Sequence, residues 1–167
     1  MKSSYQVSVS AEAFAAAMFS QAGCDVLVQY GANQPEFDLA VTRGGPTVKV
    51  SVKGSQDGGW VMTARQKEAG ISYHQAIGRW VKRHKDRSVI YCFVQFKGVP
   101  FASMPRLYLA SIREVSEYLK ASRGGLGYTS LRECYVWKRG KAKGTTDNIP
   151  IHWQMTKDRI RRLVHGR

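Results

Sequence analysis

Three charged residues stand at positions whose neighbours favour burial. Glu12 is the only charged residue between positions 11 and 24, and its helical neighbours at +3, +4 and +7 are two alanines and a phenylalanine. A carboxylate there loses hydration and needs a cation or a hydrogen-bond network, unless it stays wet near a helix end. The other two are Asp38, in "EFDLAVT", and Lys53, which closes "TVKVSVK". We expect this carboxylate and ammonium to converge.

Strand alternation predicts the face that each side chain takes. In 36–42 the larger apolar residues share one face and Asp38 takes the other, whereas in 47–53 the valines share one face and Lys53 takes the other with Ser51. If the strands pair as a hairpin across "RGGP", Asp38 and Lys53 lie on one face near one end of the sheet. A cross-strand ion pair, which contributes little when exposed, explains the same pattern more simply.

The first part of the chain is typical of one helix followed by strands. Ser10 can cap a helix over 11–22 that ends at Gly23. Strands are predicted over 25–30, 36–42 and 47–53, and "GGWVMT" is a short fourth candidate.

The rest of the chain adds helices and strands in turn. A helix begins at Ser72, "SVIYCFVQF" is a central strand and "RLYLA" another, and Ser111 with Glu114 forms a capping box for a further helix. Segment 122–150 is predicted to be loop with one strand near "ECYVWK", before a basic helix at "TKDRIRRLV". The order predicts one α/β domain over 1–167, with a mixed central sheet flanked by helices. Further β/α elements follow as C-terminal additions over about 97–167.

The charge of the chain favours a polyanionic partner. The formal net charge is +14, and residues 1–52 hold three basic and four acidic side chains while residues 53–167 hold 23 and eight. We therefore expect nucleic acid rather than a membrane as partner, although basic proteins without catalysis also exist.

The longest uncharged stretch is too short to span a bilayer. Three cysteines without paired spacing indicate neither a zinc site nor a disulfide framework, which fits a reducing, cytoplasmic compartment.

Glu12, "GCDVLVQYGANQPEFDLAV" and "VKVSVKGS" together resemble the core of the PD-(D/E)xK nuclease superfamily. Its members include restriction endonucleases, archaeal Holliday-junction resolvases and some homing endonucleases. The resemblance covers about residues 10–96 and implies a restriction-endonuclease-like αβββαβ core. The activity that it implies is metal-dependent endonucleolytic hydrolysis of DNA.

The resemblance also implies a role for each residue of the site. Asp38 and a second carboxylate bind Mg²⁺, for which Mn²⁺ substitutes, and the main-chain carbonyl of Val52 is a further ligand. The metal polarises the scissile phosphate and lowers the pKa of an attacking water, while Lys53 stabilises or orients that nucleophile. Glu12 matches a helix glutamate that resolvase-type members use as an outer contact to metal or water.

Ser51 departs from the family pattern, because most members have Glu or Asp there. In one interpretation the carboxylate has moved: a subset of restriction enzymes has Ser-x-Lys and takes a glutamate from the following helix. Glu68, fifteen positions after Lys53, is the candidate here. In the other interpretation the site is degenerate, and the domain binds DNA or RNA without cutting it. Gln56 and Asp57 could also reach the metal, but they are more typical of an ordinary turn.

Basic side chains supply the predicted nucleic-acid surface, because point charges of this kind bind phosphate oxygens. The residues are Arg79, Lys82, Arg83, Lys138, Arg139, Lys141, Lys143, Arg161 and Arg162, and the same surface is expected to include Lys85 and Arg159. Tyr135 and Trp137 could stack on a base, although strand packing is the more ordinary role. His74 could contact a phosphate or simply pack. A homodimer would place two centres for paired cuts in a duplex.

Overall fold

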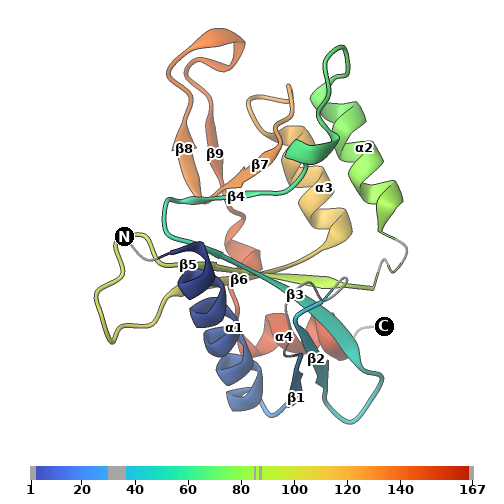
Figure 1. Ribbon diagram of the computed structural model, residues 1–167, viewed down its shortest axis with the longest axis vertical. Helices are drawn as coiled ribbons and strands as arrows, with labels where there is room; N and C mark the ends of the chain where they lie inside the picture. Colours follow the sequence, from blue (N-terminus) through green and yellow to red (C-terminus); the bar gives the residue numbers. More distant parts are fainter. Residues whose placement is uncertain (1–2, 30–36, 85, 87, 166–167) are drawn as a thin grey trace. The chain divides into compact units, whose positions relative to one another are not determined.

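A five-stranded mixed sheet organises the computed structural model, in the order β1-β2-β3-β5-β6 (Figure 1). The three strands β1, β2 and β3 form an antiparallel meander, β5 runs parallel to β3, and β6 returns antiparallel to β5. Their bounds are Asp25–Val28, Leu39–Thr42, Val48–Ser55, Ile90–Gln95 and Arg106–Ser111. The predicted α/β class and mixed sheet are thus confirmed.

The structure describes residues 3–29, 37–84, 86 and 88–165, with the side chain of residue 165 left out. The outer ends of two predicted strands, Tyr30 and Glu36, and the basic residue Lys85 lie outside these ranges. The chain forms two compact units, each described by itself below. The first comprises 1–57, 88–111 and 151–167, and the second comprises 58–87 and 112–150.

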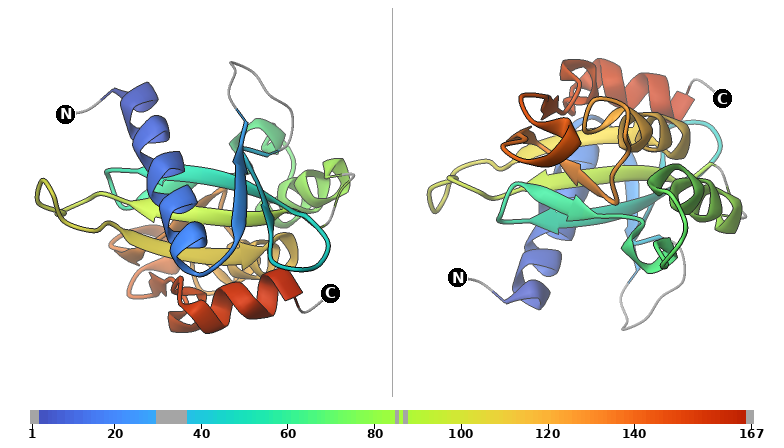
Figure 2. Two further views of the ribbon diagram at one scale, coloured as in Figure 1. Left: turned by 90° about the horizontal axis from the view of Figure 1, so that it is seen from below. Right: turned by 90° about the horizontal axis from the view of Figure 1, so that it is seen from above.

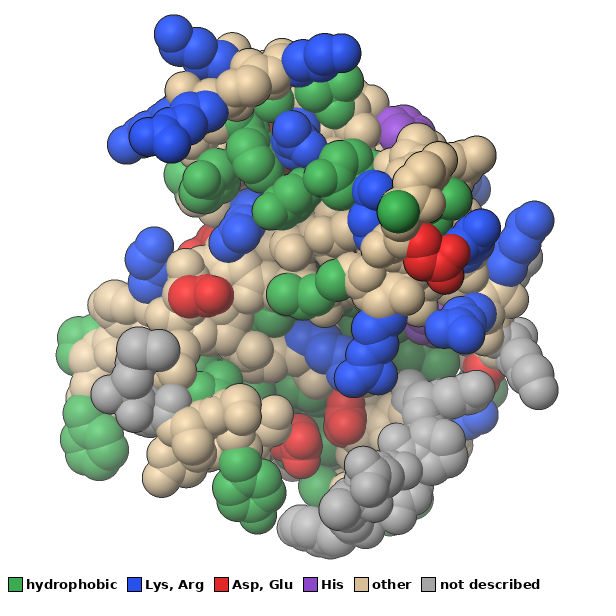
Figure 3. Space-filling model, turned by 45° about the horizontal axis from the view of Figure 1, so that its top comes forward, with side chains coloured by type: hydrophobic (Ala, Val, Ile, Leu, Met, Phe, Trp, Pro, Cys, Tyr) green, Lys and Arg blue, Asp and Glu red, His purple; other side chains and the backbone are tan. Residues whose placement is uncertain are grey.

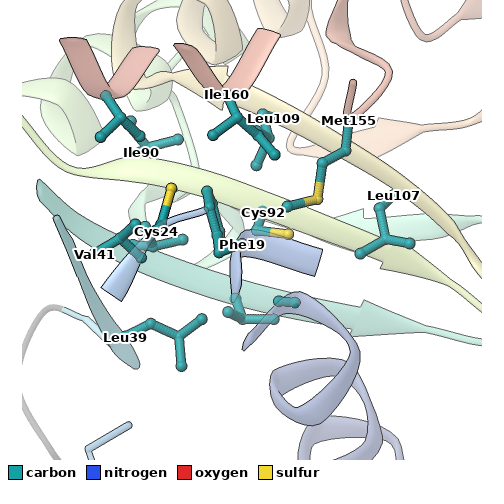
Figure 4. Packing of buried hydrophobic residues seen from close by; sticks show 14 of the residues in the cluster. Phe19, Cys24, Leu39, Val41, Ile90, Cys92, Leu107, Leu109, Met155 and Ile160 are labelled. Atoms are coloured by element: carbon teal, nitrogen blue, oxygen red, sulfur yellow. The ribbon is translucent and has the colours of Figure 1, made fainter. Parts of the chain in front are cut away.

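Two helices cover one face of the large sheet in the first unit. They are α1 (Ser4–Gln21) and α4 (Lys157–His165), and Figure 2 shows both against the strands. One hydrophobic cluster joins Phe19 of α1 and Ile160 of α4 to strand residues that are partners in register, such as Cys92 and Leu109 (Figure 4). Residues of alternate parity therefore point to the opposite face.

Helix α1 begins seven residues earlier than the predicted start at position 11. Ser3 caps it, because the Ser3 hydroxyl accepts the Gln6 N–H while the Gln6 side chain accepts the Ser3 N–H. Val7 is also buried, at the same four-residue spacing as Ala11 and the later core residues of this helix. The end is as predicted, since Gly23 follows with a positive φ of 82°.

Close packing joins α1 to β3 at Gly54. A Cβ on Gly54 would lie 2.9 Å from Val7 Cγ1, 2.9 Å from the Val7 carbonyl oxygen and 3.0 Å from the Ala11 Cβ. Only a residue without a side chain allows the helix to lie this close to the strand. The absence of a side chain thus sets the spacing between α1 and β3 directly after Lys53.

The second unit consists of two helices and two small sheets. Helix α2 (Tyr73–Arg83) has the Ser72 cap at the predicted start, and α3 (Ile112–Ala121) follows β6 as expected. Strand β4 (Gly59–Val61), predicted as a short candidate, pairs with β7 (Ser130–Arg132).

The prediction of one strand in segment 122–150 is wrong, because the structure has three short strands there. Besides β7, strands β8 (Cys134–Val136) and β9 (Thr146–Asn148) form an antiparallel hairpin. Each has three residues, which is too short for alternation to be recognised in the sequence.

The ends and bends of the chain add smaller elements. Short 3-10 turns occupy Ala64–Gln66, Gly140–Ala142 and Ile151–Trp153.

The three cysteines are free: Cys24 and Cys92 are buried, and Cys134 is exposed. No helix in the described ranges has the length and apolar run that crossing a membrane requires.

Candidate active site

Asp38 lies at the point where β2 stops pairing with β3. Its backbone N–H donates to the Val50 carbonyl at 2.9 Å. Its carboxylate then takes over, because Oδ2 accepts the Val52 N–H at 2.6 Å and the Ser51 hydroxyl at 3.4 Å. The side chain of Asp38 thus continues the β2–β3 ladder by one step and is fixed on the Ser51 side of β3.

Lys53 follows on that same side of β3. Ser51 is only 6% exposed, whereas Lys53 is the one exposed residue of β3, two positions before the strand ends at Ser55. Since residues two apart share a face, the Lys53 side chain and the Asp38 carboxylate both lie on the face of β3 that Ser51 occupies. The structure therefore places the two residues on one face of β3, as alternation predicts.

Glu12 contributes a second carboxylate from α1. It is half-buried, and burial raises its pKa above the ordinary value, with the Asp38 charge raising it further and the Lys53 charge opposing both. Both side chains are therefore close enough to act on Glu12 electrostatically. Asp38, which directly precedes β2, and Lys53 of β3 thus lie within electrostatic range of Glu12 on α1.

The donor set of this cluster is made of oxygen atoms. Glu12 and Asp38 supply carboxylates, and the Val52 main chain is adjacent because its N–H binds Asp38. Hard cations such as Mg²⁺ favour carboxylate and carbonyl oxygens and often use only one or two protein carboxylates. Within the described ranges, no group of three or more His, Cys, Asp or Glu side chains is arranged to hold a metal.

Sequence reasoning missed Tyr91, a residue on the neighbouring strand. It is the register partner of Ser51 in β5 and is 4% exposed. Burial raises its pKa, and the negative charge of Asp38 raises it further. A tyrosine within a strand is ordinary in sequence, so only the parallel pairing of β3 with β5 places its hydroxyl-bearing ring near the acid.

A buried polar network occupies the same face beyond Lys53. Gln95, which is fully buried, donates from Nε2 to the Ser55 hydroxyl at 3.2 Å, and its Oε1 accepts the Lys97 N–H. The Ser55 hydroxyl donates to Asp57 at 2.9 Å. The contact to Ser55 supports the turn role expected of Asp57. Gln56 is half-buried in the same turn. The one signal in the sequence was a glutamine inside the apolar run "IYCFVQ".

Glu68 belongs to the second unit, and the structure describes its surroundings there. Its Oε2 accepts from Arg79 at 2.8 Å, with both side chains largely exposed. The pair lines a hollow of about 300 Å³ together with Arg65, Gln66, Lys82 and Arg83. Four cations around one acid make this an electropositive hollow in the second unit. A metal-binding role for Glu68 stays a prediction.

The predicted nucleic-acid residues are all exposed. Arg161 and Arg162 lie on α4 in the first unit, and the others lie in the second unit, on α2 and in the loop that joins β8 to β9. Figure 3 shows Lys and Arg side chains over much of the visible surface.

Two further sequence expectations concern single residues of the helices. Arg159, expected beside the basic surface, is instead 7% exposed and donates to the Leu109 carbonyl, so that expectation was wrong. Arg159 directly precedes buried Ile160 in α4, and its guanidinium is turned toward the backbone of β6. His74 is exposed, and its Nε2 lies 2.9 Å from the Gly125 carbonyl oxygen.

No family model, curated protein or solved structure matches this chain in the comparisons with known proteins. The functional proposal therefore rests on the side chains and contacts of the chain itself.

Proposed function

We propose that this chain is an Mg²⁺-dependent DNA endonuclease of the PD-(D/E)xK type, which hydrolyses phosphodiester bonds by metal-activated water. The observation that carries the proposal is that Asp38, held by the Val52 N–H where β2 leaves β3, shares a face of β3 with Lys53, and that both charges act on the Glu12 carboxyl. The strand order, with an antiparallel meander followed by a parallel strand, supports a restriction-endonuclease-like core.

The electrostatics of the two acids suit a divalent cation. The Asp38 charge raises the pKa of Glu12, which means that the two carboxylates repel each other when both are ionised. A bound divalent cation would relieve that repulsion. When bound, Mg²⁺ supplies positive charge at the scissile phosphate and makes a water more acidic.

The chain's own groups then have separate tasks. Asp38 is held by the Val52 N–H, so its carboxylate keeps one orientation toward the ligand site. The exposed ammonium of Lys53 is placed to stabilise negative charge that develops on the phosphate. Glu12, in its partly desolvated position, orients water or the metal from the α1 side.

DNA is the proposed substrate because the chain has a net charge of +14 and its exposed Lys and Arg side chains give affinity for phosphates. We further propose a reducing, cytoplasmic setting, which three free cysteines support. A homodimer would allow paired cuts in the two strands of a duplex.

A catalytically inactive PD-(D/E)xK-like module that binds DNA or RNA is the second candidate. One observation favours it: Ser51 stands in place of the usual acid and donates to Asp38 instead of adding a carboxylate. In this role the cluster of Glu12, Asp38 and Lys53 would serve only to hold α1, β2 and β3 together.

A plasmid-nicking assay with Mg²⁺ or Mn²⁺ tests the proposal. We expect metal-dependent nicking that falls about 10²- to 10³-fold in Lys53→Ala, the usual effect of removing a group that stabilises transition-state charge. Lys49→Ala is the matched control, since Lys49 lies on the same strand and has the same parity, and it should cut normally. Binding without cutting by the wild-type protein would instead identify the inactive module.

A further inference from the structure

The β8–β9 hairpin of the second unit presents an exposed aromatic side chain next to a cationic loop. All three residues of β8 are exposed, and Tyr135 has 41% of its surface open to solvent. The loop 138–143 that follows has the sequence "KRGKAK", which holds four cations and no acid. Figure 3 shows hydrophobic and basic side chains together toward the top of the view, where this hairpin lies.

Two arginines contact aromatic rings of this hairpin and of the segments packed around it. Arg123 lies over the rings of Tyr73, Tyr128 and Trp137, with its Cζ 5.0–5.6 Å from their centroids. Arg132 lies over Tyr135 at 5.3 Å. Cation–π contacts of this kind fix the orientation of a ring without covering it completely.

A buried acid anchors the same cluster. Asp147 of β9 is 7% exposed, and its two oxygens accept the backbone N–H of Arg123 at 2.9 Å and the Trp137 Nε1–H at 2.8 Å. The Tyr135 ring contacts the Trp137 ring edge-on, with centroids 4.7 Å apart. Tyr135 is thus oriented before any ligand binds, which lowers the entropy lost on binding.

Backbone pairing also closes the cationic loop at its base. The Trp137 N–H donates to the Thr145 carbonyl at 2.9 Å, and the Gly144 N–H donates to the Trp137 carbonyl at 2.8 Å. Gly140 and Gly144 have φ angles of 69° and 87°, values that favour glycine. The charges are therefore carried by a defined turn that continues directly from the aromatic strand.

We propose that the β8–β9 hairpin binds single-stranded nucleic acid, with an unpaired base stacked on Tyr135 and the adjoining phosphates bound by Lys138, Arg139, Lys141 and Lys143. An open aromatic ring beside a run of cations matches the two faces of such a strand, namely flat bases and a charged backbone. A duplex keeps the flat faces of its bases inside the stack and offers phosphates and base edges instead. This inference rests on contacts within the second unit and does not depend on hydrolysis.

Fluorescence anisotropy in EDTA tests the inference with a labelled oligo(dT) strand and a duplex of equal length. We expect Tyr135→Ala to weaken binding of the single strand about 5- to 100-fold, the range of base–aromatic stacking, and binding of the duplex less than about twofold. Tyr135→Phe keeps the ring and should restore single-strand binding. Tyr5→Ala is the matched control, because Tyr5 is 76% exposed in the other unit.

The phosphate part of the inference has its own readout. The double variant Lys138→Ala, Arg139→Ala should weaken the binding of both the single strand and the duplex. It should also reduce the slope of log K against log salt by about 1 to 2. Equal loss for strand and duplex in Tyr135→Ala, or no loss, overturns the inference. Competition by poly-glutamate that depends on Tyr135 also overturns it, because the surface would then bind an acidic peptide. Binding is measured without metal, so failure here leaves the nuclease proposal separately testable.

Discussion

The carboxylate of Asp38 does the work of a backbone carbonyl, since its Oδ2 accepts the Val52 N–H at 2.6 Å where β2 no longer offers a pairing partner. Val52 is 7% exposed, so its N–H has little access to water. The same acid that we propose as a metal ligand therefore also extends the hydrogen bonding between β2 and β3. Variants of Asp38 can separate its hydrogen bond to Val52 from its proposed role as a metal ligand.

Asp38→Asn keeps an acceptor oxygen and removes only the charge. We expect it to lose about 1 kcal/mol of unfolding free energy, the difference between a charged and a neutral hydrogen bond, whereas Asp38→Ala should lose about 1–3 kcal/mol because it leaves a buried donor unpaired. Urea denaturation measures both. Mg²⁺ at about 100 times its Kd should stabilise the wild type by about 2.7 kcal/mol and neither variant. If Asp38→Ala were as stable as the wild type, the hydrogen bond between Asp38 and the Val52 N–H would contribute nothing to the free energy of unfolding.

Glu12→Gln should change how stability depends on pH. The raised carboxyl pKa means that the folded chain holds this proton more tightly than the unfolded chain. Glu12 therefore costs nothing below its ordinary pKa of 4.5, and its cost grows as pH rises through the folded pKa. In EDTA, the Tm of Glu12→Gln minus that of the wild type should increase from about pH 4 to about pH 7. A constant difference over that range would contradict the burial of Glu12 next to Asp38.

Glu68→Ala separates the two interpretations of Ser51. If Glu68 is the displaced carboxylate, nicking is lost while DNA binding remains. If it is only the counter-charge of Arg79, nicking persists and DNA binding tightens, because a hollow lined by Arg65, Arg79, Lys82 and Arg83 loses its acid. Stability should change by no more than about 1 kcal/mol, since the pair is exposed. Glu117→Ala is the matched control, since it removes an exposed pair of the same 2.8 Å length in the same unit.

Ser51→Glu tests the degenerate interpretation from the opposite direction. In an inactive wild-type protein, the new carboxylate would restore the family pattern beside Asp38, which Ser51 already contacts. We then expect metal-dependent nicking to appear. Ser55→Glu is the control, because Ser55 has the same parity on β3 but binds Asp57 and Gln95 instead.

Gly54→Ala should separate α1 from β3. The added Cβ would lie 2.9–3.0 Å from Val7 and Ala11, so the helix must shift, at a cost of about 1–3 kcal/mol in unfolding free energy. Because that shift also moves Glu12, nicking should fall. Gly78→Ala, inside α2 with nothing within 4 Å of the new Cβ, should instead stabilise the protein by about 0.5–1 kcal/mol. Equal effects of the two substitutions would rule out the helix–strand contact as the cause.

The hairpin around the site could be predicted because local chemistry fixes its register. The "RGGP" turn pairs Leu39 with Val50 and Val41 with Val48, and with that register alternation decides the faces of Asp38 and Lys53. The apolar neighbours of Glu12 indicated partial burial but left open a solvated position near the helix end, and the structure shows it half-buried. These features depend on residues that are close in the sequence.

Features that depend on distant pairing were missed. Tyr91 lies near Asp38 because β5 runs parallel to β3. Strand β7 pairs with β4, which is about seventy residues earlier in the sequence, so local sequence gives no sign of that pairing. The start of α1 was misplaced for a different reason, since Ser3 and Ser10 both resemble caps. Gln6 completes the box at Ser3, and burial of Val7 extends the helix through it.

The two compact units are interleaved along the chain, so the polypeptide passes between them at 57–58, 87–88, 111–112 and 150–151. Neither unit is a contiguous stretch of sequence. A single cut of the chain, or a truncation at either end, therefore cannot isolate one unit without breaking the other unit. The β8–β9 hairpin and the residues Glu12, Asp38 and Lys53 therefore cannot be separated by one cut of the chain without breaking at least one of the two units.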